Sequence, residues 1–475
     1  MSEGPAIGRD EWVARADEII ERHRLLGLAD RVPGWARLLA FVVAVAAIPL
    51  ITDDGYVNSV VFDTLVFCLL ALGLNVAVGW GGLLDLGYIA FFGFGAYTYA
   101  ILSSDKFGLH LTSPLVLVIV LVLGALLGFL VGLPSWRLVG DYLAIVTLFA
   151  YQIFISLVTN GHDLFGVDLT GGVNGISDLD PFDVFGFELP VSHRGIFNSN
   201  YVYVALVLFV AVFGALHLIN HSRIGRAWRA LREDTLAAEL MGMPTDWLKL
   251  LAFAFGASVA AMTGSLFASL KIGVFPETFS LTLLITVYAM LILGGVGSQT
   301  GAVLGAVVVY VFLEALRNAD VSGWVFYLAV VLALLYLLRP RWMVAVVLAA
   351  TVAFGFVAHA VAGAIDESWT AGAPPDAGAV TRALDVWVAI PASPGDAKPV
   401  AYVVLIALLL VTTVVTGVRR YALLVPTLYL AAFVWETVLA PQPDVTRFAL
   451  LGALLVGIMI TRPWGILGER RVEIV

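Results

Sequence analysis

Charged residues and cysteine are both scarce in this sequence. Only 13% of the 475 residues are charged, whereas 61% are hydrophobic. Soluble domains contain about 25% charged and about 45–50% apolar residues, so the composition excludes an ordinary soluble domain of this length. The single cysteine, Cys68, excludes an internal disulfide and a cysteine-based zinc site. Because Cys68 lies in an apolar run, we expect a buried thiol.

Motifs for enzymatic chemistry are also missing. No G-x-x-x-x-G-K-[ST] sequence occurs, so the chain is not expected to bind ATP through a P-loop. The seven histidines are scattered without metal-ligand or catalytic-triad spacing, and nothing resembles a nucleophile elbow. The few basic residues form no basic face, which argues against a nucleic-acid partner. We therefore expect no enzyme, no metal and no cofactor bound by this chain.

Long apolar runs are what the sequence has in abundance. A membrane-spanning helix needs about 20 mostly apolar residues. Candidate spans, some of them short or interrupted by glycine, are residues 36–52, 57–79, 83–102, 112–133, 140–158, 200–219, 248–270, 280–294, 299–316, 324–338, 342–363, 401–417, 421–440 and 446–461. The sequence therefore predicts an all-α, polytopic helical membrane protein with about 14 transmembrane helices in a lipid bilayer.

Lysine and arginine predict the orientation of these spans. With the N-terminus inside and the spans alternating, 19 of the 26 basic residues fall on inside segments and 7 on outside segments. This bias follows the positive-inside rule, so both termini are expected in the cytoplasm and the protein in the cell (inner or plasma) membrane. The polar start of the chain predicts no cleavable signal peptide.

Four parts follow from this topology. They are a cytoplasmic N-terminal segment (1–35), a transmembrane core (36–338) with an inside loop (222–249), additional transmembrane helices (339–461) with an outer loop (364–400), and a cytoplasmic tail (462–475).

The inside loop carries the strongest functional signal. Leu231, Leu236, Leu240 and Met241 recur at roughly helical spacing, which indicates a short amphipathic helix suited to a partner's groove. The residues expected to couple the chain to that partner are Arg226, Arg229, Arg232, Glu233, Asp234, Ala237, Ala238 and Gly242. The alternative is an ordinary charged loop anchored by positive-inside arginines.

A glycine-rich segment, residues 74–102, indicates a broken membrane helix. Small residues let membrane helices approach closely, and they weaken a helix where it must break. Asn75 and Asp85 are polar groups near membrane depth, where an acid is expected to be functional. The alternative for Asp85, which the residues slightly favour, is that it caps a helix at the break.

Two further glycine clusters are notable. Gly171, Gly172, Asn174 and Gly175 form a predicted turn with exposed backbone groups in the outer loop, read equally well as a plain turn or as a substrate contact. Residues 290–305 join two spans by a very short link, which predicts a tightly packed helical hairpin.

Five ordered segments resemble the LivM family, the inner-membrane permeases of high-affinity branched-chain amino acid ABC importers. The resemblance covers residues 57–338 and resumes at RPWGILGE, residues 462–469. The five segments are Leu74–Tyr97, Gly140–Ile153, Thr170–Ile176, Ser222–Met243 and Leu293–Ala306. Related urea permeases tend to differ from the LGGVGS of Leu293–Ser298, which favours amino acids.

The resemblance implies partners and roles. A LivH-like second permease, two separate ABC ATPase subunits that bind ATP, and an extracytoplasmic binding protein would complete the importer. The inside loop would dock on an ATPase. The residues expected near the substrate pathway are Asn75, Gly79, Gly82, Asp85, Tyr88, Phe91, Gln152, Gly171, Gly172, Asn174 and Gly175.

Departures from the family pattern leave the substrate open. Gln152 replaces a glutamate, Tyr88 a histidine, Asp85 a common serine and Val173 a proline. Residues 342–440 resemble an insertion of about three helices between two RP signatures. The alternatives are an ABC permease for urea or another small solute, or a secondary transporter. Asp63 and Asp85 are the main acids noted inside spans, and their scarcity weakens the secondary transporter.

Overall fold

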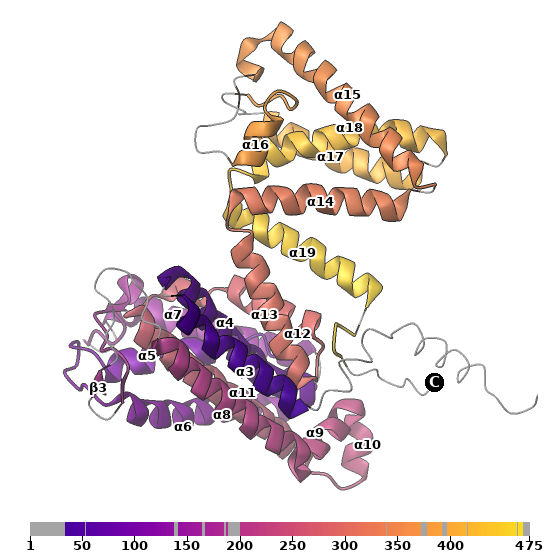
Figure 1. Cartoon of the computed structure of the whole chain (residues 1–475). Helices are drawn as coiled ribbons and strands as arrows, with labels where there is room; N and C mark the ends of the chain where they lie inside the picture. The colour runs from indigo at the N-terminus through magenta and orange to yellow at the C-terminus, as the bar shows by residue number, and fades with distance from the viewer. Residues whose placement is uncertain are drawn as a thin grey trace, which may run out of the picture.

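The protein is almost entirely helical (Figure 1). The computed structural model describes residues 34–52, 54–136, 141–163, 167–184, 187–188, 200–338, 340–370, 372, 378–391, 397–415, 417–462 and 464–468. Most of the predicted N-terminal segment 1–35, Arg339 and Pro463 of the two RP signatures, and residues 469–475 of the predicted tail lie outside the described residues.

A first group of helices forms one packed body. It contains α3 (Gly34–Ile51), α4 (Gly55–Leu74), the π-helical turn η1 (Asn75–Trp80), α5 (Tyr88–Leu102), α6 (Ser113–Gly132), α7 (Asp141–Asn160), α8 (Asn200–His221), α9 (Arg223–Glu233), α10 (Thr235–Leu240), α11 (Thr245–Lys271), α12 (Leu281–Gly294) and α13 (Gln299–Ala315). Short 3-10 turns are η2 (Leu133–Trp136), η3 (Gly161–Asp163), η4 (Gly172–Asn174) and η5 (Pro276–Phe279).

Two small antiparallel sheets close one end of this group. Strand β1 (Ile176–Ser177) pairs with β4 (Gly273–Val274), and β2 (Asp183–Val184) pairs with β3 (Phe187–Glu188). The first sheet joins the predicted outer loop to the chain that follows α11.

A second group stands apart from the first in Figure 1. It contains α14 (Ala319–Leu337), α15 (Trp342–Ile365), η6 (Glu367–Thr370), α16 (Ala379–Leu384), α17 (Ala397–Val414), α18 (Val418–Val434) and the π-helical turn η7 (Trp435–Leu439). Helix α19 (Pro443–Thr461) then runs back to the first group (Figure 1).

Every predicted span falls on a helix, but the predicted number of crossings is not confirmed. In the described ranges, seven helices are long and apolar enough to cross a membrane, or up to eight if the pair α13 and α14, bent by 112°, is one span. The seven are Gly55–Trp80, Ser113–Gly132, Tyr142–Asn160, Asn200–His221, Thr245–Lys271, Trp342–Ile365 and Val418–Leu439.

Some predicted spans form helices that are too short to cross a bilayer. Helix α5 has 15 residues and α12 has 14. At a rise of about 1.5 Å per residue, 15 residues extend roughly 22 Å, less than the ~30 Å of a bilayer's hydrocarbon core. The predicted span 83–102 was wrong at its start, because residues 83–87 are not helical.

Helix α11 is held by close contact with α5 and α6. From Val116 on, the buried residues of α6 recur every four positions and include Gly124, Gly128 and Gly132. A Cβ on Gly124 or Gly128 would meet Ala261 or Ala257 of α11. Lipid supplies no hydrophobic force between helices, so this close approach replaces it with van der Waals contact.

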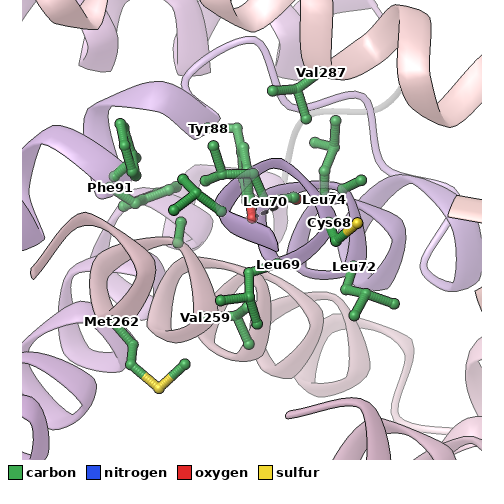
Figure 2. Close-up of a cluster of buried hydrophobic side chains, with 14 of the residues drawn as sticks. Cys68, Leu69, Leu70, Leu72, Leu74, Tyr88, Phe91, Val259, Met262 and Val287 are labelled. Carbon is green, nitrogen blue, oxygen red and sulfur yellow. Dashed lines mark hydrogen bonds between the residues drawn. The ribbon is translucent and has the colours of Figure 1, made fainter. Parts of the chain in front are cut away.

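Helix α4 lies at the centre of the buried core. Figure 2 shows its side chains from Cys68 to Leu74 near Val259 of α11 and Val287 of α12. The Cys68 thiol is fully buried, as its apolar surroundings predicted. Tyr88 of α5 donates a hydrogen bond of 2.9 Å to the carbonyl of Leu70.

The two packed groups divide the chain differently from the predicted parts. Leu334 and Leu338 pack with Val344 and Val347, so α14 belongs with the additional helices. The boundary in space therefore falls between α13 and α14, not after residue 338. Leu451 of α19 belongs to the core of the first group.

The end of the described chain also returns to the first group. Ile466 N donates to the Leu293 carbonyl and Leu467 N to the Gly294 carbonyl, each at 2.9 Å. Residues 465–467, which follow the second RP signature, therefore lie against the LGGVGS segment, beyond the additional helices.

We expect Gly264→Ala to lower the stability of the protein. A Cβ on Gly264 would meet the Phe92 carbonyl oxygen of α5, and such overpacking costs about 1–3 kcal/mol. Gly214→Ala is the matched control, because nothing lies within 4 Å of a Cβ there. Thermal unfolding in detergent should show a lower midpoint for Gly264→Ala alone. Equal midpoints would contradict the close packing of α5 on α11.

Candidate functional site

The break after α4 is clamped to the link between α12 and α13. Gly297 N donates to Asn75 Oδ1 at 2.8 Å, and Trp80 Nε1 donates to the Gly297 carbonyl at 3.0 Å. A Cβ on Gly79 would meet the same Asn75 oxygen and Gly297 N. The two glycine-rich segments of the sequence are therefore parts of one structure.

Asp85 closes the turn between the break and α5, whose N-cap residue is Gly87 and has no side-chain cap. Its side chain is buried, and Oδ1 accepts a 2.9 Å hydrogen bond from Gly87 N just before α5. Tyr288 of α12 donates its hydroxyl to the Asp85 carbonyl at 2.7 Å and accepts from Asp85 N at 3.1 Å. Thr147 of α7 accepts from Leu86 N at 2.9 Å. The side chain therefore holds the turn before α5 and accepts from no N–H of the helix itself, so it is not the predicted helix cap, and substrate contact stays a prediction.

The other predicted pathway side chains divide by exposure. Asn75, Tyr88 and Phe91 are buried within this chain. Gln152 is exposed on α7, and Asn174 is exposed in the outer turn. Gly82 is exposed as well, Gly171 and Gly175 are half-buried, and the assignment of the whole set to a substrate pathway stays a prediction.

The outer turn has the backbone geometry that its glycines predict. Gly171, Gly172 and Gly175 have φ values of 73°, 61° and 66°, a left-handed region that favours glycine. Asp168 Oδ1 accepts from Gly171 N at 2.7 Å and lies 2.9 Å from Lys106 Nζ.

Two donors therefore stabilise the Asp168 carboxylate. The hydrogen bond from Lys106, then that from the Gly171 backbone, lowers the pKa of Asp168 below its ordinary value. The turn places Val173 outward with 65% of its surface exposed.

The inside loop folds as two short helices rather than one. Ser222 caps α9 by accepting from Ile224 N and Gly225 N. Asp234 interrupts the helix with an extended backbone, and its Oδ1 accepts from Ala237 N at 2.9 Å to cap α10.

Helix α9 is fixed to the core. Trp228 is fully buried, donates Nε1 to the Leu248 carbonyl at 2.8 Å, and stacks on Trp80 with ring centroids 6.2 Å apart. Leu231 is buried as well. Of the apolar residues that recur in the loop, Leu231 anchors α9 to the core. Leu236, Leu240 and Met241 lie on α10 and at its C-cap.

Three of the four arginines of α9 donate hydrogen bonds to their own chain. Arg226 Nη1 donates to the His221 carbonyl at 3.0 Å, and Arg229 Nη1 to Asn220 Oδ1 at 3.2 Å. Arg232 Nη2 donates to the Val296 carbonyl at 3.4 Å, next to Gly297. Arg232 also covers Gly82, where a Cβ would meet its Cγ at 3.2 Å.

Helix α10 carries the exposed part of the loop. We call Leu236, Leu240 and Met241 the tip patch; they are 67%, 80% and 82% exposed. Glu233, Asp234, Ala237 and Gly242 are also exposed, whereas Ala238 is buried. The spacing of the tip patch was visible in the sequence, but its residues are absent from the set predicted to couple the chain to a partner.

Two acids inside predicted spans were missed in the sequence. Glu314 of α13 accepts the Tyr56 hydroxyl at 2.6 Å, and Glu436 in η7 accepts the Tyr327 hydroxyl at 2.7 Å. Asp63, which the sequence did single out, lies 3.2 Å from Lys271 Nζ. Acids in spans are therefore less scarce than the argument against a secondary transporter assumed.

These features define a multi-pass helical membrane protein whose core contains a broken helix. The family described as branched-chain amino acid transport system / permease component matches residues 56–338. The chain belongs to this family of transport permeases, as the resemblance predicted.

Individual relatives agree with the family. The chain is 38% identical over 298 residues to the high-affinity branched-chain amino acid transport system permease protein LivM of Salmonella typhimurium, covering 59% of this chain and 68% of the relative. LivM of Escherichia coli K12 is 37% identical with the same coverage. LivH of Escherichia coli K12 is 25% identical over 265 residues, covering 54% of this chain and 83% of the relative. No solved structure matches.

Asp85 offers a direct test of a structural role in the turn before α5 against substrate contact. Asp85→Asn keeps an oxygen that accepts from Gly87 N, so we expect uptake within about threefold of the unsubstituted protein. Asp85→Leu leaves a buried N–H unpaired, which costs about 1–3 kcal/mol, and should lower the unfolding midpoint. Radiolabelled leucine uptake and thermal unfolding measure the two effects. Abolished uptake in Asp85→Asn at normal stability would show that the charge itself acts.

Proposed function

We propose that the chain is a permease subunit of an ATP-driven importer that takes up leucine, isoleucine and valine. The family match and the similarity to LivM and LivH permeases for branched-chain amino acids support this substrate class. A LivH-like permease would pair with the chain, two separate ABC ATPases would bind ATP, and an extracytoplasmic binding protein would deliver the amino acid. The complex would lie in the cell membrane with both termini of this chain in the cytoplasm.

The tip patch is the observation that carries the coupling role. Three large apolar side chains lie exposed on α10, outside the apolar helices. Exposed apolar clusters of this kind mark interaction sites, and a short helix with an apolar face fits a groove on a partner. In Figure 1, α9 and α10 project from one end of the first group, away from the additional helices.

Contacts on α9 would carry a movement of α10 to the broken helix. Trp228 stacks on Trp80 at the end of η1, and Arg232 binds the Val296 carbonyl in the link before α13. Both contacts end at the clamp around Gly297. Closure of the ATPases would thus displace α9, shift the clamp and change access between the two permeases. Weak contacts with the amino acid suffice, because tight binding would slow its release.

The outer turn is the proposed docking point of the binding protein. Val173 and Asn174 are exposed there, and β1 and β4 join the turn to the end of α11. A docked binding protein would therefore press on the same helix whose other end receives Trp228.

Paired substitutions at the two ends test both assignments. Leu240→Asp should abolish co-purification of the ATPases, because it places a charge in the tip patch, which is solvent-exposed in this chain. Val173→Asp makes the same change at an equally accessible apolar position and should retain the ATPases. We expect Val173→Asp to lose stimulation of ATP hydrolysis by the binding protein, measured in liposomes. ATPases that still co-purify with Leu240→Asp would refute the tip patch as a docking surface.

Arg232 tests the transmission step. Arg232→Gln is too short to reach the Val296 carbonyl, so the ATPases should still bind and hydrolyse ATP while uptake falls at least tenfold. Arg223→Gln is the matched control, because Arg223 is an exposed arginine of the same helix that lies outside the set predicted to couple the chain to a partner. The ratio of amino acid transported to ATP hydrolysed measures the effect. An unchanged ratio in Arg232→Gln would exclude this residue from coupling.

A further inference from the structure

A pocket of about 220 Å³ lies where α19 packs on the first group. Its lining comes from α4, α12, α13, α19 and the turn before α12. Pockets for drug-sized ligands measure about 300–1,000 Å³, so this volume suits one smaller molecule. Glu314 lies at the end of α13 and Arg447 at the start of α19, so the pocket opens at the end that the proposed orientation places outside.

Opposite charges line this pocket. The Glu314 side chain is only 14% exposed and accepts from Tyr56 at 2.6 Å and from Arg317 at 3.5 Å. Arg447 lies 2.9 Å from Asp444, and its side chain is 25% exposed. The Arg447 Nε is buried without a hydrogen-bond partner. A buried donor without a partner is costly, so an acceptor supplied by a ligand would stabilise it.

The rest of the lining combines hydroxyl groups with apolar walls. Thr278, Ser280 and Thr282 supply hydroxyl groups beside the N-terminus of α12, where the helix dipole favours negative charge. Phe67 and Leu313 supply apolar surface. A carboxylate, a guanidinium, hydroxyl groups and an apolar wall together match a small zwitterion with an aliphatic side chain.

We propose that this pocket binds a free α-amino acid. Its ammonium group would pair with Glu314, its carboxylate with Arg447, and its side chain would lie against Phe67 and Leu313. This site is separate from the proposed transport function. One of its two charged residues, Arg447, lies outside residues 56–338 that the family matches. The site does not depend on which solute the importer moves. A phosphatidylethanolamine head group shares the ammonium and anion, but the small volume favours the free amino acid.

Equilibrium binding to the purified full chain tests the proposal. Radiolabelled leucine should bind saturably in detergent. Glu314→Gln and Arg447→Gln should each weaken binding at least tenfold, because each removes one charge partner. Arg382→Gln is the matched control and should bind leucine normally, because Arg382 is exposed on α16 and does not line the pocket. Leucinamide and 4-methylpentanoate, which each lack one charge, should compete at least tenfold more weakly than leucine.

A pocket-filling variant distinguishes loss of the binding site from misfolding of the protein. Thr282→Phe keeps both charges and adds bulk at an exposed position of the lining, so it should lose leucine binding at an unchanged unfolding midpoint. Absence of saturable binding, or leucine binding that survives Thr282→Phe, would overturn the proposal. So would displacement of leucine by short-chain phosphatidylethanolamine at lower concentrations than by leucine itself. Leucine uptake by the assembled importer is measured separately, so failure of the pocket and failure of the importer proposal give different results.

Discussion

Close packing of α11 against α5 and α6 fixes the positions of the inside loop and of the outer turn. Lipid offers no hydrophobic force between helices, so small residues such as Gly124, Gly128 and Gly264 supply contact through closely approaching backbones. With α11 held in this way, its first turn presents the Leu248 carbonyl to Trp228. Its last turn leads into β4, which pairs with β1 at the outer turn. One helix therefore links the two surfaces proposed to meet partners.

The broken helix is possible because the core satisfies its polar groups. Asn75 and Trp80 bind both sides of Gly297, while Asp85 and Tyr288 complete the start of α5. Irregular backbone at membrane depth is tolerated where protein buries it. The residues that look most like substrate ligands in the sequence thus maintain the break. Movement of this clamp is part of the proposed coupling, and contact of these residues with a solute stays a prediction.

The additional helices are more than an appendage to the family core. Helix α14, within the range matched by the family, packs with them, whereas α19 and Ile466 return to the first group. This exchange fastens the two groups together. It also brings Arg447 to the same pocket as Glu314, so a residue outside the family match completes a site with residues inside it.

Composition and periodicity alone determined the membrane class, the helices beneath every predicted span, and the loop that carries the tip patch. These depend on local properties, since about 20 apolar residues make a membrane helix wherever they lie. Only the tertiary structure decided which residues meet. Asn75 and Gly297 are 222 positions apart, and no spacing rule connects them. Arg232 is expected from the sequence to contact a partner, yet its Nη2 donates to the Val296 carbonyl of the same chain, 64 positions away. Helical period identifies a face, but the packing of neighbouring helices determines whether that face meets protein, lipid or water.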